Sequence, residues 1–232
     1  MEKLIFWIKK ISALFSFVGS SNAQENVLLD PHFWSEMDLF DKGQSVINAI
    51  EQGADIRAYD KNRLTPLHFA VKQGIIPNVT LTAVVLLLDE GANIEARDKY
   101  GLTPLHYAAG GFNVTERGVS ITREVVALLL DRGANIQVCD IKKRTPLHIA
   151  GLCSESSAVV KLLLDRGANC LAKDIDEKTP YDYAQKSISP KQGFISCQIY
   201  EAQKQQEPVS QEQQEEIGNP QKLSFGGLIS ID

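Results

Sequence analysis

The sequence predicts an all-α solenoid, in which pairs of helices stack in a row and short extended loops join the pairs. The tetrapeptide Thr-Pro-Leu-His occurs three times, and an altered copy, Thr-Pro-Tyr-Asp, follows. Each of the four copies begins 12 positions after the glycine of a Gly-Ala-Asx turn. Such internal repetition indicates stacked repeats that bury a continuous core between neighbours. The threonines are Thr65, Thr103, Thr145 and Thr179, and the glycines are Gly53, Gly91, Gly133 and Gly167.

Each Thr-Pro pair is expected to begin the first helix of a repeat. A threonine hydroxyl can accept a hydrogen bond from an amide of the first turn, and proline at the first helical position has no N–H to leave unpaired. Apolar runs such as 125–130 and 159–164 predict a second helix. This helix is expected to end at the glycine, where a left-handed backbone costs little. The stretch that follows, such as 134–140, is predicted to form an extended finger.

The spacing of the repeats predicts where extra residues lie. Successive Thr-Pro copies are 38, 42 and 34 residues apart, whereas the distance from glycine to threonine is constant. The additional residues are therefore expected between the first and second helices, near 75–80 and 111–121. Insertions confined to this edge leave the stacking surfaces intact.

The Gly-Ala-Asx turn, the finger and the Thr-Pro-Leu-His helix together resemble the ankyrin repeat, whose period is about 33 residues. The resemblance covers residues 27–202 or so and implies an all-α ankyrin-repeat solenoid of about five repeats, including degenerate caps. The boundaries expected from it are 27–60 for a degenerate N-terminal repeat, 61–97 for an ankyrin repeat, 98–139 for an ankyrin repeat with an insertion, 140–173 for a further ankyrin repeat, and 174–202 for a C-terminal capping repeat.

The resemblance also implies a candidate binding site. Partners of ankyrin proteins usually bind the concave side, which is formed by the finger ends and the first helices. The matching positions here combine apolar and aromatic groups with Arg and Lys, a mixture expected of a protein interface. The alternative is a solvated surface of mixed composition. The partner-binding residues predicted are Tyr59, Lys61, Asn62 and Leu64 in the first finger, Arg97, Lys99, Tyr100 and Leu102 in the second, and Ile141, Lys142 and Arg144 in the third.

One turn position in each finger departs from the ankyrin pattern. The residue that is usually Gly in this family is Gly101 in the second finger, but Arg63, Lys143 and Glu177 in the others. If these residues keep a left-handed backbone, each stores strain of about 1 kcal/mol. The alternative is that the fingers bend differently, which would alter the predicted site.

The sequence offers no catalytic or metal-binding signature. Motifs such as G-x-S-x-G, H-E-x-x-H and the phosphate loop are missing, so neither an enzyme nor a cofactor is predicted. The four cysteines form no CxxC pair, and no metal site is expected. The histidines of the tetrapeptides are expected to bond locally and to link neighbouring repeats. The recurring finger aspartates are expected to bond the local backbone; they are Asp60, Asp98, Asp140 and Asp174.

The two ends of the chain differ in composition from the repeats. Residues 1–23 have lysines, an apolar run and a terminal Ser-Asn-Ala, which is the layout of a secretory signal peptide. The alternative is a basic amphipathic stretch that lies on a membrane surface or packs on the array. The protein is expected to be secreted or periplasmic in the first case, and cytoplasmic or membrane-surface otherwise. Residues 203–232 begin with a Gln/Glu-rich stretch and are predicted to form a disordered tail.

These observations predict a non-catalytic module that binds a protein partner. The net charge of −5 argues against nucleic acid as the partner, and no small-molecule substrate is expected. Membrane contact is expected only through the N-terminal segment, if it is not cleaved. The chain also looks like ankyrin proteins of bacteria that live inside or beside host cells, which implies export. The alternatives are a periplasmic structural or chaperone-like protein, or a targeting subunit of an enzyme complex.

Overall fold

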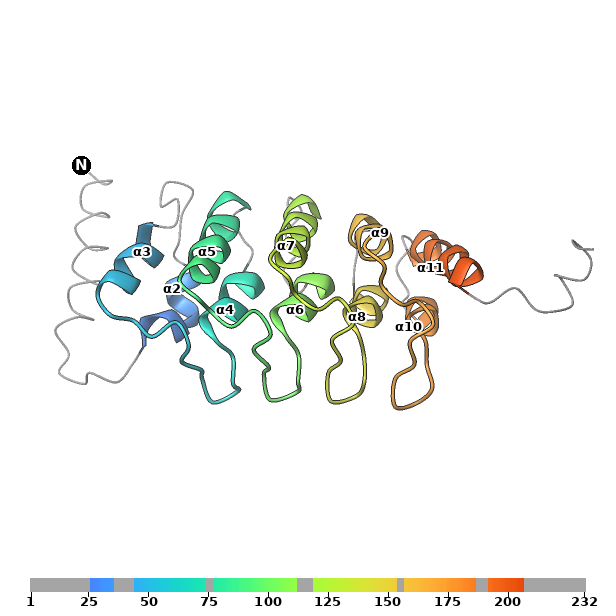
Figure 1. Cartoon of the computed structure of the whole chain (residues 1–232), viewed down its shortest axis with the longest axis horizontal. Helices are drawn as coiled ribbons and strands as arrows, with labels where there is room; N and C mark the ends of the chain where they lie inside the picture. The colour runs from blue at the N-terminus through green and yellow to red at the C-terminus, as the bar shows by residue number, and fades with distance from the viewer. Residues whose placement is uncertain are drawn as a thin grey trace, which may run out of the picture.

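The computed structural model describes residues 26–35, 44–73, 77–111, 119–153, 157–186 and 192–206. In these ranges it contains one short 3-10 helix and ten α-helices, without a strand. Figure 1 shows the α-helices as a row of pairs, with long loops projecting from one side of the row. The predicted all-α solenoid is therefore confirmed. The predicted signal peptide and most of the predicted tail lie outside the described residues.

Each pair has a first helix close to the projecting loops and a second helix farther from them (Figure 1). The pairs stack in chain order, because each first helix from α4 to α10 packs against the next one. The first helices are α2 (Pro31–Ser35), α4 (Pro66–Gln73), α6 (Pro104–Gly110), α8 (Pro146–Cys153) and α10 (Pro180–Lys186). The second helices are α3 (Gln44–Glu51), α5 (Pro77–Asp89), α7 (Val119–Asp131), α9 (Ser157–Asp165) and α11 (Gln192–Gln206), and η1 (Val27–Leu29) precedes the first pair.

The Thr-Pro-Leu-His tetrapeptide closes a local hydrogen-bonded unit at the start of a first helix. In α6, Thr103 is the N-cap, Pro104 follows it, and Thr103 and His106 form a capping box. The Thr103 hydroxyl lies 3.0 Å from Nδ1 of His106, and the Thr103 amide donates to the same nitrogen at 3.1 Å. The His106 imidazole thus accepts the N-cap amide, as the side chain of Glu or Gln at the third helical position does in the usual capping box. Thr103 therefore occupies the predicted N-cap position, and the bonds that its amide and hydroxyl make there run to the histidine ring.

The glycines that follow the second helices have the left-handed backbone that was expected. Gly53, Gly91, Gly133 and Gly167 have φ values between 83° and 89°. At the end of α7, the Ala134 amide donates to Leu129 O at 2.9 Å and the Gly133 amide to Leu130 O at 3.0 Å. This pair of bonds satisfies carbonyl groups that the helix end would otherwise leave unpaired. The turn therefore ends each second helix and directs the chain into the next finger.

The extra residues in the longer repeats are partly helical, in contrast to the expected loop insertions. Helices α5 and α7 have 13 residues each, whereas α9 has nine. Three residues, 74–76, separate α4 from α5, the same number as separates α8 from α9. The insertion predicted near 75–80 therefore lengthens a second helix by about one turn. Among the second, third and fourth pairs, the α6–α7 connection is the longest one, and it spans 111–118.

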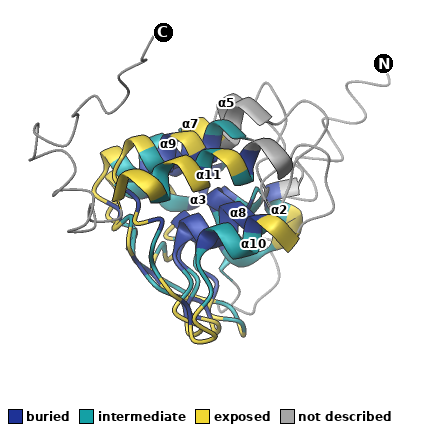
Figure 2. Cartoon of the chain, turned by 90° about the vertical axis from the view of Figure 1, so that its right-hand side faces the viewer, coloured by how far each residue is buried: buried dark blue, intermediate teal, exposed yellow. Residues whose placement is uncertain are grey.

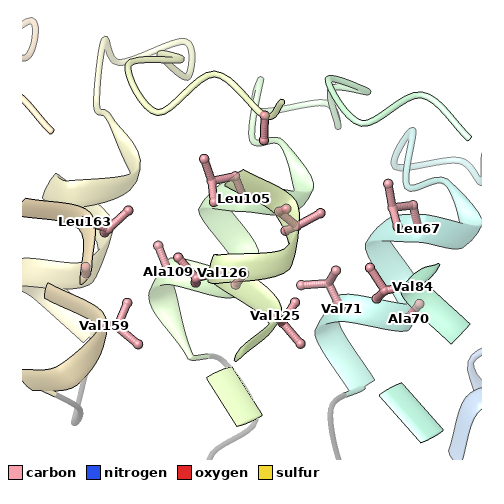
Figure 3. Close-up of a cluster of buried hydrophobic side chains, with 14 of the residues drawn as sticks. Leu67, Ala70, Val71, Val84, Leu105, Ala109, Val125, Val126, Val159 and Leu163 are labelled. Atoms are coloured by element: carbon pink, nitrogen blue, oxygen red, sulfur yellow. The ribbon is translucent and has the colours of Figure 1, made fainter. Parts of the chain in front are cut away.

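The core is built from the same positions in successive repeats. The leucine of each Thr-Pro-Leu-His tetrapeptide is fully buried, and so are a valine and a leucine of each of the helices α5, α7 and α9. A buried alanine follows two positions after the tetrapeptide histidine, where a small side chain lets neighbouring helices approach. Figure 3 shows part of this cluster of buried side chains, with Leu67, Leu105 and Leu163 labelled on successive repeats. The equivalent sets are Leu67, Val84 and Leu87; Leu105, Val126 and Leu129; and Leu147, Val160 and Leu163, with Ala70, Ala108 and Ala150.

Helix α11 covers the C-terminal end of the stack. Gln206 accepts a hydrogen bond from the Cys170 amide at 3.0 Å and donates to Ala168 O at 3.1 Å. Gln203 donates to Cys170 O at 3.1 Å. These two glutamine side chains bond backbone groups of the turn that follows α9, and they thereby attach α11 to the preceding pair. The boundary predicted between 202 and 203 is therefore moved, because the first glutamines of the predicted tail belong to the last helix.

Candidate functional site

Each finger is shaped by one aspartate at its base. Oδ1 of Asp98 accepts the amides of Tyr100 and Leu102, both at 2.8 Å. The Asp98 amide also donates to Leu102 O at 3.0 Å, so the finger closes into a tight turn. Asp60, Asp140 and Asp174 accept amides two and four residues on in the same way. The predicted backbone role of these aspartates is confirmed.

The second carboxylate oxygen connects the base of the finger to its surroundings. The Tyr107 hydroxyl donates to Asp98 Oδ2 at 2.8 Å, and the Tyr183 hydroxyl donates to Asp174 Oδ2 at 2.5 Å. Burial, together with the carboxylate bond, raises the pKa of Tyr183 to about 12. Asp98 and Asp174 are therefore held by backbone and tyrosine groups at the base of their fingers.

Neighbouring fingers are joined through their backbones. The Lys99 amide donates to Asn62 O at 2.9 Å, the Ile141 amide to Tyr100 O at 3.1 Å, and the Ile175 amide to Lys142 O at 3.0 Å. These bonds keep the four finger ends in a row, and Figure 1 shows the four loops side by side. In the end-on view of Figure 2, the loop ends are exposed, as are stretches of the second helices on the other side of the molecule. We call the three residues after each finger aspartate the tip: 61–63, 99–101, 141–143 and 175–177.

The last residue of each of the four tips has a left-handed backbone conformation. Gly101 has a φ of 76°, and Arg63, Lys143 and Glu177 have φ values of 62°, 57° and 58°. The alternative in which the fingers bend differently is therefore excluded. The three non-glycine residues store strain of about 1 kcal/mol each. A Cβ at Gly101 would also lie 3.0 Å from the Ile141 backbone nitrogen, so glycine is required there for the close approach of the next finger.

The tetrapeptide histidines join each repeat to the next one. Because an amide N–H only donates, Nδ1 of His106 must be the acceptor of the Thr103 amide and carries no proton. Nε2 therefore carries the proton and donates to Arg144 O at 3.0 Å. His68 and His148 make the equivalent bonds to Leu102 O and Lys178 O. Burial lowers the pKa of His106 to about 4 and also lowers the pKa of the other two. The predicted structural role is confirmed.

Most of the predicted binding residues lie on an exposed face. Exposed large apolar side chains occur in each finger: Tyr59 is 64% exposed, Tyr100 51%, Ile141 64% and Ile175 53%. Two of the rings have a cation over them: Lys99 Nζ lies 4.9 Å from the Tyr100 centroid, and the Arg63 guanidinium lies 5.7 Å from the Tyr59 centroid. The other exposed predicted residues are Lys61, Arg97 and Lys142.

Four of the predicted binding residues are buried, half-buried or already paired, and so are less available to a partner. Leu64 is only 6% exposed and packs in the core, so its assignment to the binding surface is corrected. Arg144 is paired with Asp140, with its guanidinium nitrogens 2.6 and 2.8 Å from Oδ2. Leu102 is half-buried, and Asn62 accepts a hydrogen bond from Lys99 Nζ at 2.7 Å.

Sequence reasoning missed three exposed residues of this face. Ile175 occupies in the fourth finger the position of Ile141 in the third, and Arg63 and Lys143 occupy the left-handed turn position. The alignment of the four fingers in the sequence places all three at positions equivalent to other tip residues, and this equivalence was the available signal. The Thr-Pro-Tyr-Asp copy marks the fourth finger as part of a cap, and the turn position predicts a backbone conformation and not a contact, so neither pattern by itself indicates a binding residue.

The described residues contain neither a candidate metal cluster nor a candidate membrane span. No group of three or more His, Cys, Asp or Glu side chains that could hold a metal ion is found among them. Within the same residues, no helix has the length and apolar character needed to cross a membrane. What the site presents is a row of exposed apolar and basic side chains on a rigid set of fingers.

Comparison with known proteins agrees with this architecture. A family description of ankyrin repeats in three copies matches residues 39–117, one of ankyrin repeats in many copies matches 124–184, and one of a single ankyrin repeat matches 100–141. A search of curated proteins finds no match. Ankyrin repeats are in general protein–protein interaction modules and are typically non-catalytic. The helix pairs, the fingers and the matched segments lead to one conclusion: the chain belongs to the ankyrin repeat family.

Proposed function

We propose that this protein binds a protein partner through its finger ends, with the second and third fingers at the centre of the contact. The observation that supports this most is the position of the exposed apolar side chains. Of the five large apolar residues that are exposed in the described part of the chain, four lie in the fingers: Tyr59, Tyr100, Ile141 and Ile175. Exposed apolar groups that gather on one face mark interaction sites.

Tyr100 is the proposed anchor of this contact. Its ring is half exposed at a tip, it lies beside the Lys99 ammonium, and its carbonyl is fixed by the Ile141 amide. Aromatic residues on a pre-organised backbone bind with little loss of conformational entropy. Interfaces concentrate their energy in a few such residues.

The test is affinity capture with the full chain, followed by binding measurements on the captured protein. Tyr100→Ala is expected to weaken binding by about 2 kcal/mol and to change the folding free energy by less than about 0.5 kcal/mol, because the side chain is exposed. The control is deletion within 112–117, in the predicted insertion between α6 and α7, which should leave affinity unchanged. If the deletion abolishes binding while Tyr100→Ala binds like the parent, the inserted edge and not the finger face is the binding surface.

Export from the producing cell is a separate proposal. It rests on the order of lysines, apolar run and small residues in 1–23. If this segment is removed during secretion, the finger face meets its partner outside the cytoplasm.

A further inference from the structure

The charges on the four tips are distributed unequally. The first three tips contain five basic residues and no acidic one, whereas the fourth tip contains two acidic residues and no basic one. All seven charged residues are exposed. The chain as a whole has a formal net charge of −5, so the basic tips stand out against an acidic background. The basic residues are Lys61, Arg63, Lys99, Lys142 and Lys143, and the acidic ones are Asp176 and Glu177.

The basic tips have no carboxylate partners among the described residues. Ion pairs form elsewhere, as between Arg132 and Asp89 or Lys161 and Asp165. In the fourth finger the tip acids are paired with neighbouring lysines: Glu177 with Lys173 at 3.0 Å and Asp176 with Lys178 at 3.8 Å. None of the five basic tip residues takes part in an ion pair in the described part of the chain.

The finger aspartates are not available to pair with these cations from the outside. Each Oδ1 accepts two backbone amides, and the carboxyl groups of Asp98 and Asp140 are buried at the finger base. The tips therefore combine exposed cations with the exposed apolar groups Tyr100 and Ile141, and the exposed Tyr59 lies just before the aspartate of the first finger. A complementary surface carries carboxylates next to apolar side chains.

We propose that the first three finger tips bind an acidic segment of a partner protein, in which Asp or Glu residues lie beside apolar ones. The inference rests on the proposed function of the finger face and adds the charge of its partner. Carboxylates of the segment pair with the lysines and the arginine, while its apolar groups contact Tyr100 and Ile141. The fourth tip bounds the site, because Asp176 and Glu177 repel such a segment.

A protein segment fits these tips better than a nucleic acid does. Proteins that bind nucleic acid usually have a basic domain overall, whereas this chain is acidic. The exposed Ile141 of the third tip adds apolar contact that a phosphate backbone does not use.

The decisive variant exchanges the charges of one tip for those of another. Lys142→Asp with Lys143→Glu gives the third tip the acidic pair of the fourth. Glu177 already has a φ of 58°, close to the 57° of Lys143, so this pair is compatible with the backbone. The control, Lys161→Glu with Lys186→Glu, makes the same change in net charge at exposed helical positions outside the tips.

The experiment selects peptides from a random phage-displayed library on the full chain, then measures the selected peptides by fluorescence anisotropy. The expected peptides are rich in Asp and Glu and contain apolar residues. Their affinity should fall about tenfold in the Lys142→Asp/Lys143→Glu variant and stay within about twofold in the control. The converse variant, Asp176→Lys with Glu177→Lys, should strengthen binding. Higher salt should weaken parental binding, because exposed charges are screened.

The two proposals fail in different ways. If no selected peptide depends on Tyr100 or Ile141, the proposed function fails, and the acidic partner with it. If the peptides depend on Tyr100 but are neutral or basic, or are unaffected by the charge exchange, only the acidic partner is overturned.

Three further probes test whether something other than an acidic protein segment binds the tips. Duplex DNA and phosphatidylserine vesicles are measured against the same variants. Tip-dependent binding of either one as tight as that of the peptides would overturn the assignment to a protein segment. A synthetic peptide of residues 207–232, which contains four glutamates, is used as a competitor. If it binds the tips more tightly than every selected peptide, the occupant is this chain's own C-terminal segment, and the partner assignment is wrong.

Discussion

Adding one methyl group at Gly151 should loosen the C-terminal end of the stack. Gly151 is buried in α8, and a Cβ there would lie 2.8 Å from the Pro180 carbonyl oxygen, 3.5 Å from the Ala184 nitrogen and 3.7 Å from the Ala184 Cβ. The first of these distances is shorter than any ordinary contact. The atom it meets belongs to the backbone of α10, so relief requires α10 to move away from α8.

Two opposing effects set the change in the free energy of unfolding that Gly151→Ala causes. Alanine is favoured over glycine inside a helix by about 1 kcal/mol. Overpacking of a well-packed contact typically costs about 1–3 kcal/mol. The movement of α10 would also stretch the bond between His148 Nε2 and Lys178 O, now 3.1 Å, and such a bond contributes about 1 kcal/mol. Gly151→Ala should therefore destabilise the protein by about 1–2 kcal/mol, although an unhindered helical glycine would give the opposite sign.

The equivalent residue in α6 supplies the control. Ala109 occupies the same position after the helix-starting proline, so a Cβ is accommodated one repeat earlier. Ala109→Gly should destabilise by about 1 kcal/mol through helix propensity alone, plus the loss of a buried methyl. Urea unfolding followed by circular dichroism measures both variants, and hydrogen exchange should show faster opening of α10 and α11 in Gly151→Ala. Equal or greater stability of Gly151→Ala than of the parent would refute the close contact between α8 and α10.

Three further predictions concern the histidines, the turn strain and the leader. The buried His106 has a pKa of about 4, below the ordinary 6.5; its contribution to stability should be complete above pH 6.5 and should decline as the pH falls towards 4. The loss of about 3 kcal/mol should appear in urea midpoints between pH 7 and 4.5, and a constant midpoint would contradict the buried neutral imidazole. Lys143→Gly should stabilise by about 0.5–1 kcal/mol, because relief of left-handed strain exceeds the added chain entropy; a lower thermal midpoint would show that Lys143 is unstrained. Ala23→Arg should block processing of the N-terminus in an exporting cell; N-terminal sequencing decides this, and intact Met1 in the exported parent would remove the signal hypothesis.

Local features were predictable from the sequence because their causes lie within a few residues. The Thr-Pro helix starts, the left-handed glycines and the Asp-centred turns each depend on bonds between neighbours, and all of them appear as expected. The recurrence of the same pattern then indicated stacking, because one repeat alone cannot bury its apolar face.

Features that depend on distant contacts were harder to predict. Gln203 and Gln206 look like part of a disordered segment by composition, but they bond backbone groups of Cys170 and Ala168, more than 30 residues earlier. Leu64 and Arg144 follow the finger pattern, yet one packs in the core and the other pairs with Asp140. Whether an insertion lengthens a helix or a loop is also decided by packing, which explains the unexpected extra turn of α5.

The hydrogen bonds from the tetrapeptide histidines to the next repeat, called histidine joints below, have a consequence for how the sequence of such a protein can diverge in evolution. Each joint ends on a main-chain carbonyl, and the three residues that supply it are as different as Leu102, Arg144 and Lys178. A carbonyl is present whatever the side chain, so substitution at these positions does not remove the acceptor. The amide-to-carbonyl bonds between neighbouring fingers likewise do not depend on the identity of a side chain. Variation in what the fingers recognise is thereby separated from the interactions that hold the array together, and a new specificity can arise without a new scaffold.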